Sequence, residues 1–317
     1  MKSEWHIEKG QKMKSGFFCI DKPEGITSHS VVSRMRKILD MKKIGHSGTL
    51  DPMATGVMVV GFGTSTRLLD YVQSGTKDYV ATVLFGEKTN TADRQGDVVE
   101  SVDMSNLSRD QLENVLDKFI GEIEQIPPMV SAIKVDGKKL YEYEREGKTI
   151  ERKPRRVRID EIEVLEFHEQ KENAKASAKL RVVCFAGTYI RTLAEDMAGE
   201  LGGFAHLTDL RRTKNGDVTE HACIGLEDLA ELEDPFEPAK NSLDVLGHLI
   251  QIELNEEQAT RVSQGKKLEL APSQLEQLVG KQGDVFAVFS NADPRLIAIY
   301  SATDLSELKS RCVVFLD

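Results

Sequence analysis

The chain has 317 residues, of which 40% are hydrophobic and 30% are charged, a composition typical of a globular protein and long enough for two domains. No run of about 18 apolar residues is present and residues 1–16 are polar and charged, so we expect a cytoplasmic protein without a membrane span or secretory signal. The formal net charge of -10 argues against binding of nucleic acid.

The negative charge is concentrated in the last third of the chain. Residues 217–317 contain 19 acidic and 8 basic residues, whereas residues 1–216 have a net charge of +1. Between Ser131 and Arg158, ten basic residues stand against five acidic ones. A local basic surface that could bind phosphate groups is therefore present despite the overall charge.

The first 216 residues predict strands and helices in alternation. Strands are expected where apolar residues run together or alternate with polar ones, namely over 16–20, 57–62, 77–85, 157–164 and 180–185. Helices are expected after capping residues, namely from Thr27 or Ser28, from the Ser108–Gln111 capping box, and from Tyr189 to a stop at Gly202. This mixture predicts an α/β fold, without fixing the order of the strands.

A Pro-rich acidic stretch near 234–238 predicts a linker between a domain over 1–235 and a module over 245–317. In the module we expect a helix starting at Asn255, with Gln258 completing its cap, and strands over 285–289, 296–300 and 312–316. The four cysteines form no CxxC pair, which favours reduced core residues over a disulfide framework or a zinc site.

The loop Gly45-His-Ser-Gly-Thr-Leu-Asp-Pro-Met-Ala-Thr-Gly56 is the densest candidate for a functional site, because its glycines let the backbone approach a ligand closely. The following Gly61-Phe-Gly63 is not a dinucleotide-binding pattern, because Thr66 stands where a third glycine is needed. Taken alone, Asp51 before Pro52 is equally typical of a helix N-cap, and His46 of a turn or core residue.

Other segments combine with this loop. They are Asp21-Lys-Pro-x-Gly-x-Thr-Ser28, Lys77-x-Tyr79, Asn90-Thr-Ala-Asp93, Ile126-Pro-Pro-Met-Val-Ser-Ala-Ile-Lys134, Gly137-Lys-Lys-Leu-Tyr141, Gly187-Thr-Tyr-Ile-Arg-Thr-Leu193 and His206-Leu-Thr-Asp-Leu-Arg-Arg212. Together, and in this order, they closely resemble the TruB family of tRNA pseudouridine synthases. Ser47 stands where many relatives carry Thr, another small hydroxyl residue.

The resemblance implies a mixed α/β (α+β) catalytic domain with a central, mostly antiparallel sheet, followed by a small PUA-like β module. It implies conversion of the uridine at position 55 in the T arm of tRNA into pseudouridine, by a monomer that uses no metal and no nucleotide cofactor. The basic segment, about 124–156, corresponds to an insertion that closes over the T arm in relatives. The acidic charge of the module argues against a strong RNA-binding role there.

The resemblance also implies roles for individual residues. Asp51 matches the catalytic aspartate, Arg191 the arginine that keeps it ionised, and Tyr79 the tyrosine that stacks on the flipped base. Further matches or expected RNA contacts are His46, which fills the space left by the base, Tyr189 and Leu210 at the nucleotide, Asp93 near the pocket, and Arg67, Lys77, Lys134, Arg211 and Arg212 as cations for phosphates.

Simpler interpretations accompany these assignments. Arg191 could be a surface charge on its helix, and Tyr79 a core residue of its strand. At the level of function, the alternatives are a non-catalytic RNA-binding or tRNA-chaperone protein, and a hydrolase with a catalytic aspartate. The intact set of Asp51, Tyr79 and Arg191 argues against the first, and the basic insertion is left unexplained by the second.

Overall fold

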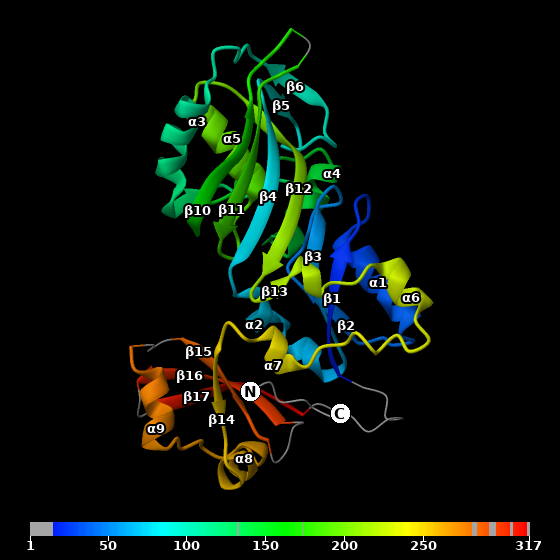
Figure 1. Ribbon diagram of the computed structural model, residues 1–317, viewed down its shortest axis with the longest axis vertical. Helices are drawn as coiled ribbons and strands as arrows, with labels where there is room; N and C mark the ends of the chain where they lie inside the picture. The colour runs from blue at the N-terminus through cyan, green and yellow to red at the C-terminus, as the bar shows by residue number, and fades with distance from the viewer. Residues whose placement is uncertain are drawn as a thin grey trace.

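A large β-sheet forms the upper part of the molecule and a smaller β module lies below it (Figure 1). The computed structural model describes residues 15–131, 133–172, 174–280, 284–291, 296–304 and 307–315. The expected mixed α/β class, with a mostly antiparallel central sheet and a small C-terminal β module, is confirmed. The likeness of that module to a PUA domain stays a prediction.

The main path of the large sheet runs β1-β3-β12-β4-β11-β10-β7, with β2 paired to β3 and β13 to β12. Its strands are β1 (Gly16–Lys22), β2 (Ile44–Ser47), β3 (Thr55–Phe62), β4 (Lys77–Phe85), β7 (Gly121–Gln125), β10 (Arg155–His168), β11 (Ser177–Cys184), β12 (Ala205–Asn215) and β13 (Val218–Thr219). The ladders are antiparallel except that between β12 and β3. The apolar β3 is buried along almost its whole length and pairs with β1, β2 and, at its start, β12.

Helices cover this sheet and its end at β1. They are α1 (Ser28–Ile38), α2 (Leu69–Gln73), α3 (Arg109–Leu116), α4 (Leu140–Arg145), α5 (Ile190–Glu200), α6 (Leu226–Glu231) and α7 (Ser242–Val245), with a 3-10 turn over Gly63–Leu68 before α2. The hydroxyl of Thr27, not Ser28, caps α1, and the Ser108–Gln111 capping box of α3 is confirmed. In the described ranges, no helix is both long and apolar enough to span a membrane.

Two small hairpins project from the sheet. One pairs β5 (Glu87–Thr89) with β6 (Val98–Ser101), and the other pairs β8 (Lys134–Val135) with β9 (Lys138–Lys139). The second hairpin and α4 lie between β7 and β10, within the basic segment expected as an insertion. The insertion is thus held at both ends by neighbouring strands of the large sheet.

The C-terminal module is a four-stranded sheet in the order β14-β15-β16-β17. Its elements are β14 (Ile250–Glu253), α8 (Glu256–Ser263), α9 (Pro272–Leu275), β15 (Val285–Phe289), β16 (Leu296–Asp304) and β17 (Glu307–Phe315). The capping box of Asn255 and Gln258 is confirmed. The last strand starts earlier than the expected 312–316, and position 316 lies outside the described residues.

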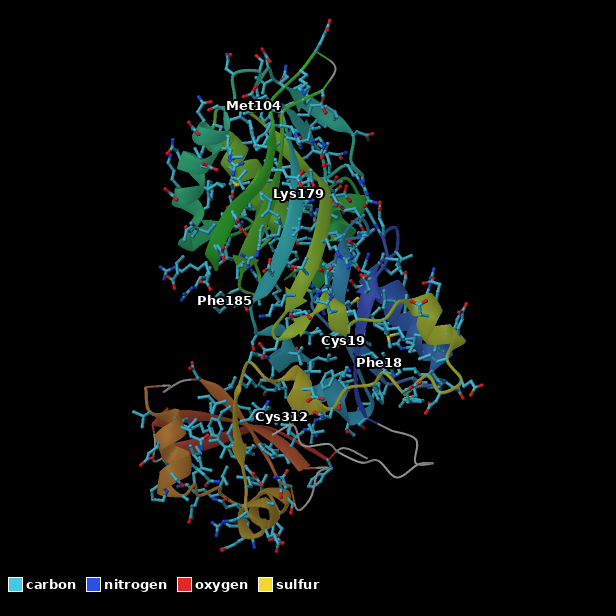
Figure 2. The ribbon with its side chains drawn as sticks, viewed as in Figure 1. Phe18, Cys19, Met104, Lys179, Phe185 and Cys312 are labelled. Atoms are coloured by element: carbon cyan, nitrogen blue, oxygen red, sulfur yellow. The ribbon has the colours of Figure 1, made fainter. Side chains whose placement is uncertain are left out.

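One apolar cluster joins the module to the large sheet. It contains Phe17, Cys19, Val57 and Val59 from β1 and β3, and Ala287, Ile297, Ile299, Cys312 and Val314 from the module. Figure 2 labels Cys19 and Cys312 on the two sides of this junction. All four cysteines are free, as expected, although Cys223 is only partly buried. The domain limits at 235 and 245 stay a prediction.

Candidate active site

The loop between β2 and β3 places Asp51 at a pocket instead of at a helix end. Residues 52–53 form a turn, closed by a hydrogen bond of 3.1 Å from the Ala54 N–H to the Asp51 carbonyl, so the helix N-cap interpretation is wrong. Beneath the loop, the fully buried Lys22 donates through Nζ to the carbonyls of Ala54 (2.7 Å), Pro52 (3.3 Å) and Pro23 (3.0 Å). Burial lowers the pKa of Lys22 to about 8.

Asp51 forms a two-pronged ion pair with Arg191, which lies in the first turn of α5. Nε of Arg191 is 2.9 Å from one carboxylate oxygen and Nη2 is 3.1 Å from the other. The Arg191 side chain is only 3% exposed, whereas that of Asp51 is 29% exposed. A ligand in the pocket can therefore reach the carboxylate but not the guanidinium behind it.

Three further oxygens hold Arg191. Nη1 donates to the Thr91 carbonyl at 3.0 Å, Nη2 donates to the Val130 carbonyl at 2.8 Å, and Asp93 lies 3.8 Å from Nη1. The interpretation of Arg191 as a surface charge is therefore wrong. A planar guanidinium with its donors occupied in this way fixes the orientation of the Asp51 carboxylate.

Burial and the neighbouring charges shift the pKa of Asp51 in opposite directions. Burial raises the pKa of the Asp51 carboxyl above its usual value, Arg191 opposes this rise, and Asp93 adds to it. Arg191 is the principal favourable partner of the charged form. The net result is a raised pKa of the Asp51 carboxyl, with Arg191 limiting the rise.

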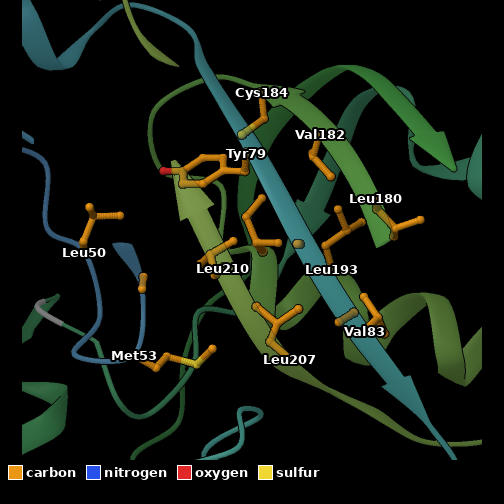
Figure 3. Close-up of a cluster of buried hydrophobic side chains, with 14 of the residues drawn as sticks. Leu50, Met53, Tyr79, Val83, Leu180, Val182, Cys184, Leu193, Leu207 and Leu210 are labelled. Carbon is orange, nitrogen blue, oxygen red and sulfur yellow. The ribbon is translucent and has the colours of Figure 1, made fainter. Parts of the chain in front are cut away.

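Tyr79 lies on β4, where its backbone pairs with Arg212 on β12 and Val182 on β11. It is 8% exposed and belongs both to the main hydrophobic cluster and to the wall of the pocket. Figure 3 shows its hydroxyl pointing toward the loop that carries Leu50. Burial raises the pKa of Tyr79, so the phenol is neutral. Tyr79 is thus both a buried core residue of its strand and part of the pocket wall.

The pocket has a volume of about 500 Å³. The candidate residues that line it are Asp51, Lys77, Tyr79, Tyr189, Arg191, Leu210 and Arg212. Arg155 and Arg156, at the start of β10, also line it and are exposed. A negatively charged ligand would therefore meet two exposed cations at a pocket whose lining mixes polar and apolar side chains.

Other candidate residues lie outside the pocket lining. Asp93 is buried and supports Arg191. His46 on β2 is half-buried, and burial lowers the pKa of its imidazole, which is therefore neutral near pH 7. Lys134 is exposed on β8 of the insertion. Arg67 donates to the carbonyl of Val313 at 2.8 Å, at the junction with the C-terminal module.

The remaining expected cations are engaged within the protein. Lys77 is buried and donates to the carbonyls of Gly75 (2.5 Å) and Gln73, and burial lowers its pKa to about 8. Arg211 forms ion pairs with Asp21 (3.0 Å) and Glu220 (2.8 Å). The roles of Lys77 and Arg211 as phosphate contacts stay predictions.

Arg212 is also engaged within the protein. It is 1% exposed and donates to the carbonyls of Val57 (2.7 Å) and Gly48 (3.3 Å), so it braces the loop of Asp51 and does not act as a surface cation.

Sequence reasoning missed two residues that position the site. Lys22 stands inside a recognised motif, but nothing in its spacing shows that it turns inward. Gln125 directly precedes another motif, is 1% exposed and bonds to the backbone of Tyr189. In the part of the chain that the structure describes, no group of three His, Cys, Asp or Glu side chains could hold a metal ion.

The chain matches two family models. Residues 36–190 match the N-terminal domain of the TruB family of pseudouridylate synthases, and residues 191–250 match the C-terminal domain of tRNA pseudouridylate synthase B. A protein named tRNA pseudouridine synthase B from Geobacillus kaustophilus is 41% identical over 276 residues, which cover 84% of this chain and 94% of the relative. Its counterpart from Corynebacterium efficiens is 43% identical over 80% of this chain and 84% of its own.

Solved structures agree with these matches. A Cbf5-Nop10-Gar1 complex contains a chain that is 25% identical, with a TM-score of 0.69 over 99% of this chain and 91% of that chain. An H/ACA RNP bound to a substrate RNA containing 2'-deoxyuridine contains another, also 25% identical, with a TM-score of 0.66 over 96% of this chain and 84% of that chain. With its sequence matches covering most of the chain, this protein belongs to the TruB family of pseudouridylate synthases.

Proposed function

We propose that this protein converts uridine 55 in the T arm of tRNA into pseudouridine, acting as a monomer without a metal or nucleotide cofactor. Curated relatives over most of its length are named tRNA pseudouridine synthase B, and a structural neighbour is bound to a substrate RNA. The residue assignments below rest on the resemblance and on the geometry of the pocket.

The observation that carries the proposal is the pairing of a reachable carboxylate with a buried guanidinium. Asp51 is open to the pocket, and Arg191 holds it through two contacts of 2.9 and 3.1 Å. A carboxylate held in this way can act as an oxygen nucleophile toward an electron-poor carbon of a nucleoside. Asp51 is therefore the nucleophile, with C1' of the ribose or C6 of the base as its target.

The reaction rearranges bonds without net gain or loss of atoms. The bond from C1' to N1 breaks, the uracil rotates, and a bond from C1' to C5 forms; C5 loses a proton and N1 gains one. The protein must supply a nucleophile, a pocket that excludes water and positioned hydrogen-bond partners. Asp51 offers the nucleophile, and the buried wall around Tyr79 limits the access of water to the pocket.

The target uridine has to leave its stack to reach Asp51, at a cost of a few kcal/mol. Tyr79 then stacks on the flipped base, with Leu210 and Tyr189 as further contacts in the pocket. The neutral imidazole of His46 occupies the space that the base leaves in the RNA. The neutral state fits this role because a neutral ring costs less to insert among stacked bases than a charged one.

The basic insertion, about 124–156, contributes the electrostatic part of RNA binding. Arg155 and Arg156 extend the positive charge from this segment to the pocket, and Lys134 is exposed on its hairpin. Arg67 and Lys77 complete the set of proposed phosphate contacts. Affinity for RNA should therefore fall steeply with added salt, because released counterions dominate such binding.

The proposal is tested with Asp51→Asn on an unmodified T-arm stem-loop transcript. The variant should fold and bind the RNA, whereas its single-turnover rate should fall by at least about 1,000-fold because the nucleophile is gone. Asp110→Asn, which changes an exposed aspartate on α3, is the matched control and should keep its rate.

Two outcomes would count against the proposal. Retained turnover by Asp51→Asn would remove Asp51 as the nucleophile. RNA binding by the wild-type protein without any pseudouridine would favour a non-catalytic RNA-binding or tRNA-chaperone protein.

A further inference from the structure

The strand that leads into the insertion, β7, is joined to α5 by one buried side chain. We call β7 and the residues just before β10 the stem of the insertion. Gln125, the last residue of β7, is 1% exposed. Its Oε1 accepts a hydrogen bond of 3.0 Å from the Tyr189 N–H, and its Nε2 donates one of 3.3 Å to the Tyr189 carbonyl. Tyr189 is the N-cap of α5 and makes no side-chain cap of its own. The first turn of α5 is therefore fixed by an amide from another strand.

The same stretch of chain contacts Arg191 directly. Five residues after Gln125, the carbonyl of Val130 accepts a hydrogen bond of 2.8 Å from Nη2 of Arg191. That nitrogen also donates to Asp51 at 3.1 Å. The position of the Val130 carbonyl thus helps to set the angle at which the guanidinium meets Asp51.

The segment between these two contacts is stiff. It contains Pro127 and Pro128, whose rings fix their φ angles, and Arg152 from the other side of the stem donates to the Pro127 carbonyl at 2.9 Å. Hydrogen bonds and this short segment therefore connect Gln125, the Val130 carbonyl and the first turn of α5. A displacement at Gln125 is passed on to Arg191 from two sides, through Tyr189 and through Val130.

We propose that Gln125 is a positioning residue for the isomerisation: its amide locks the first turn of α5 to the stem of the insertion, and so keeps Arg191 in two-pronged contact with Asp51. Gln125 itself does not line the pocket. The inference rests on the proposed function for its kinetic readout, but the geometry that it describes can be measured without RNA. A purely structural glutamine would contribute to stability without affecting the charge of Asp51.

The test compares Gln125→Met, which has a similar size but no hydrogen bonds, with Gln125→Glu, which keeps the acceptor for the Tyr189 N–H. In single turnover on the T-arm transcript, Gln125→Met should be about ten- to a hundredfold slower, with RNA affinity unchanged. Gln125→Glu should lose less of the single-turnover rate than Gln125→Met. Gln111→Met is the control: Gln111 is exposed but, like Gln125, accepts a hydrogen bond from the N–H of a helix N-cap, at 2.9 Å from Ser108.

The pH profile separates positioning from stability. The ionisable groups around Asp51 are Arg191, Asp93, Lys22, Tyr79 and Tyr189. Of these, Arg191 lowers the pKa of Asp51 most. If Gln125→Met loosens Arg191, the pKa of Asp51 should rise, and the acid limb of the pH–rate profile should move to higher pH. An unmoved acid limb, with a rate loss that only follows the unfolded fraction, would overturn the inference.

An NMR measurement decides the question even if the wild-type protein makes no pseudouridine. The Nε–H resonance of Arg191, assigned through Arg191→Lys, should shift or broaden in Gln125→Met and stay in place in Gln111→Met. An unchanged resonance in Gln125→Met would show that Gln125 does not position the guanidinium. Inactivity of the wild-type protein, by contrast, would count against the proposed function alone.

Discussion

Asp51 and Arg191 stand 140 residues apart in the sequence and within 2.9 Å in the structure. Motif resemblance could predict both residues, and also Tyr79, Tyr189 and Leu210, because each stands in a segment with several matching neighbours. Periodicity and local pattern could not predict their proximity, which depends on how the large sheet brings the loop after β2 to the start of α5.

The supporting contacts were harder to predict than the catalytic candidates. The partners of Arg191 at Thr91 and Val130 are main-chain carbonyls, which any residue type could supply. Lys22 and Arg212 are long cations that ordinarily stand in water, and only the fold shows that both turn inward to brace the Asp51 loop.

The raised pKa of Asp51 gives a prediction for pH dependence. The nucleophile must be a carboxylate, so the rate should be lost as the pH falls through the pKa of Asp51, which burial places above the ordinary value of 3.8. Single-turnover rates from about pH 4 to pH 8 check this, with circular dichroism to confirm folding at each pH. A midpoint at or below 3.8 would contradict the described environment.

At the scale of elements, capping residues predicted helix starts and the alternation of apolar with polar residues predicted a strand. The caps at Thr27, Ser108 and Asn255 and the alternating β4 match the prediction. The strands β2 and β12 were not predicted. β12 carries His, Asp, Arg and Lys side chains that hide its strand pattern, and it is held by pairing with β4 and β3 on its two sides.

Gly56 provides a prediction about the end of the loop that carries Asp51. Its φ is +98°, and a Cβ atom there would lie 2.2 Å from the carbonyl oxygen of Arg212. Gly56→Ala should therefore lower the free energy of unfolding by about 3 kcal/mol or more, measured by urea denaturation. Gly121→Ala is the matched control: its φ is also +98° but the space around it is open, so it should cost only about 1–2 kcal/mol. Equal losses would show that the close approach is unimportant.

At the scale of the whole molecule, the net charge of -10 conceals two different parts. The acidic excess lies after residue 216, and most of it lies in residues 217–244, which hold nine acidic residues and one basic residue. The site, with the exposed Arg155 and Arg156, lies in the near-neutral part. The C-terminal module, over 245–317, has ten acidic and seven basic residues and so carries only a small part of this excess. It is not an independent appendage, because its sheet shares an apolar cluster with β1 and β3. The sequence predicted the module but could not predict this junction. Both faces of β15 and β16 carry apolar residues, so the sequence does not show which face packs against the large sheet.

The shared cluster predicts that the molecule unfolds as one unit. Ile299 is fully buried in it, so Ile299→Ala should cost about 2–5 kcal/mol and still give a single transition in urea, followed by circular dichroism and fluorescence. Val279→Ala changes a side chain that is 62% exposed and should alter stability by less than about 0.5 kcal/mol. Two separate transitions would mean that the junction does not couple the module to the large sheet.

The central claim is that this protein forms pseudouridine at one site of tRNA with Asp51 as the nucleophile. The most direct measurement incubates the purified protein with a full-length, unmodified tRNA transcript and maps pseudouridine chemically at every uridine. We expect modification at position 55 of the T arm by the wild-type protein, and none by Asp51→Asn. A transcript that stays unmodified, modification at other uridines, or product formed by Asp51→Asn would contradict it.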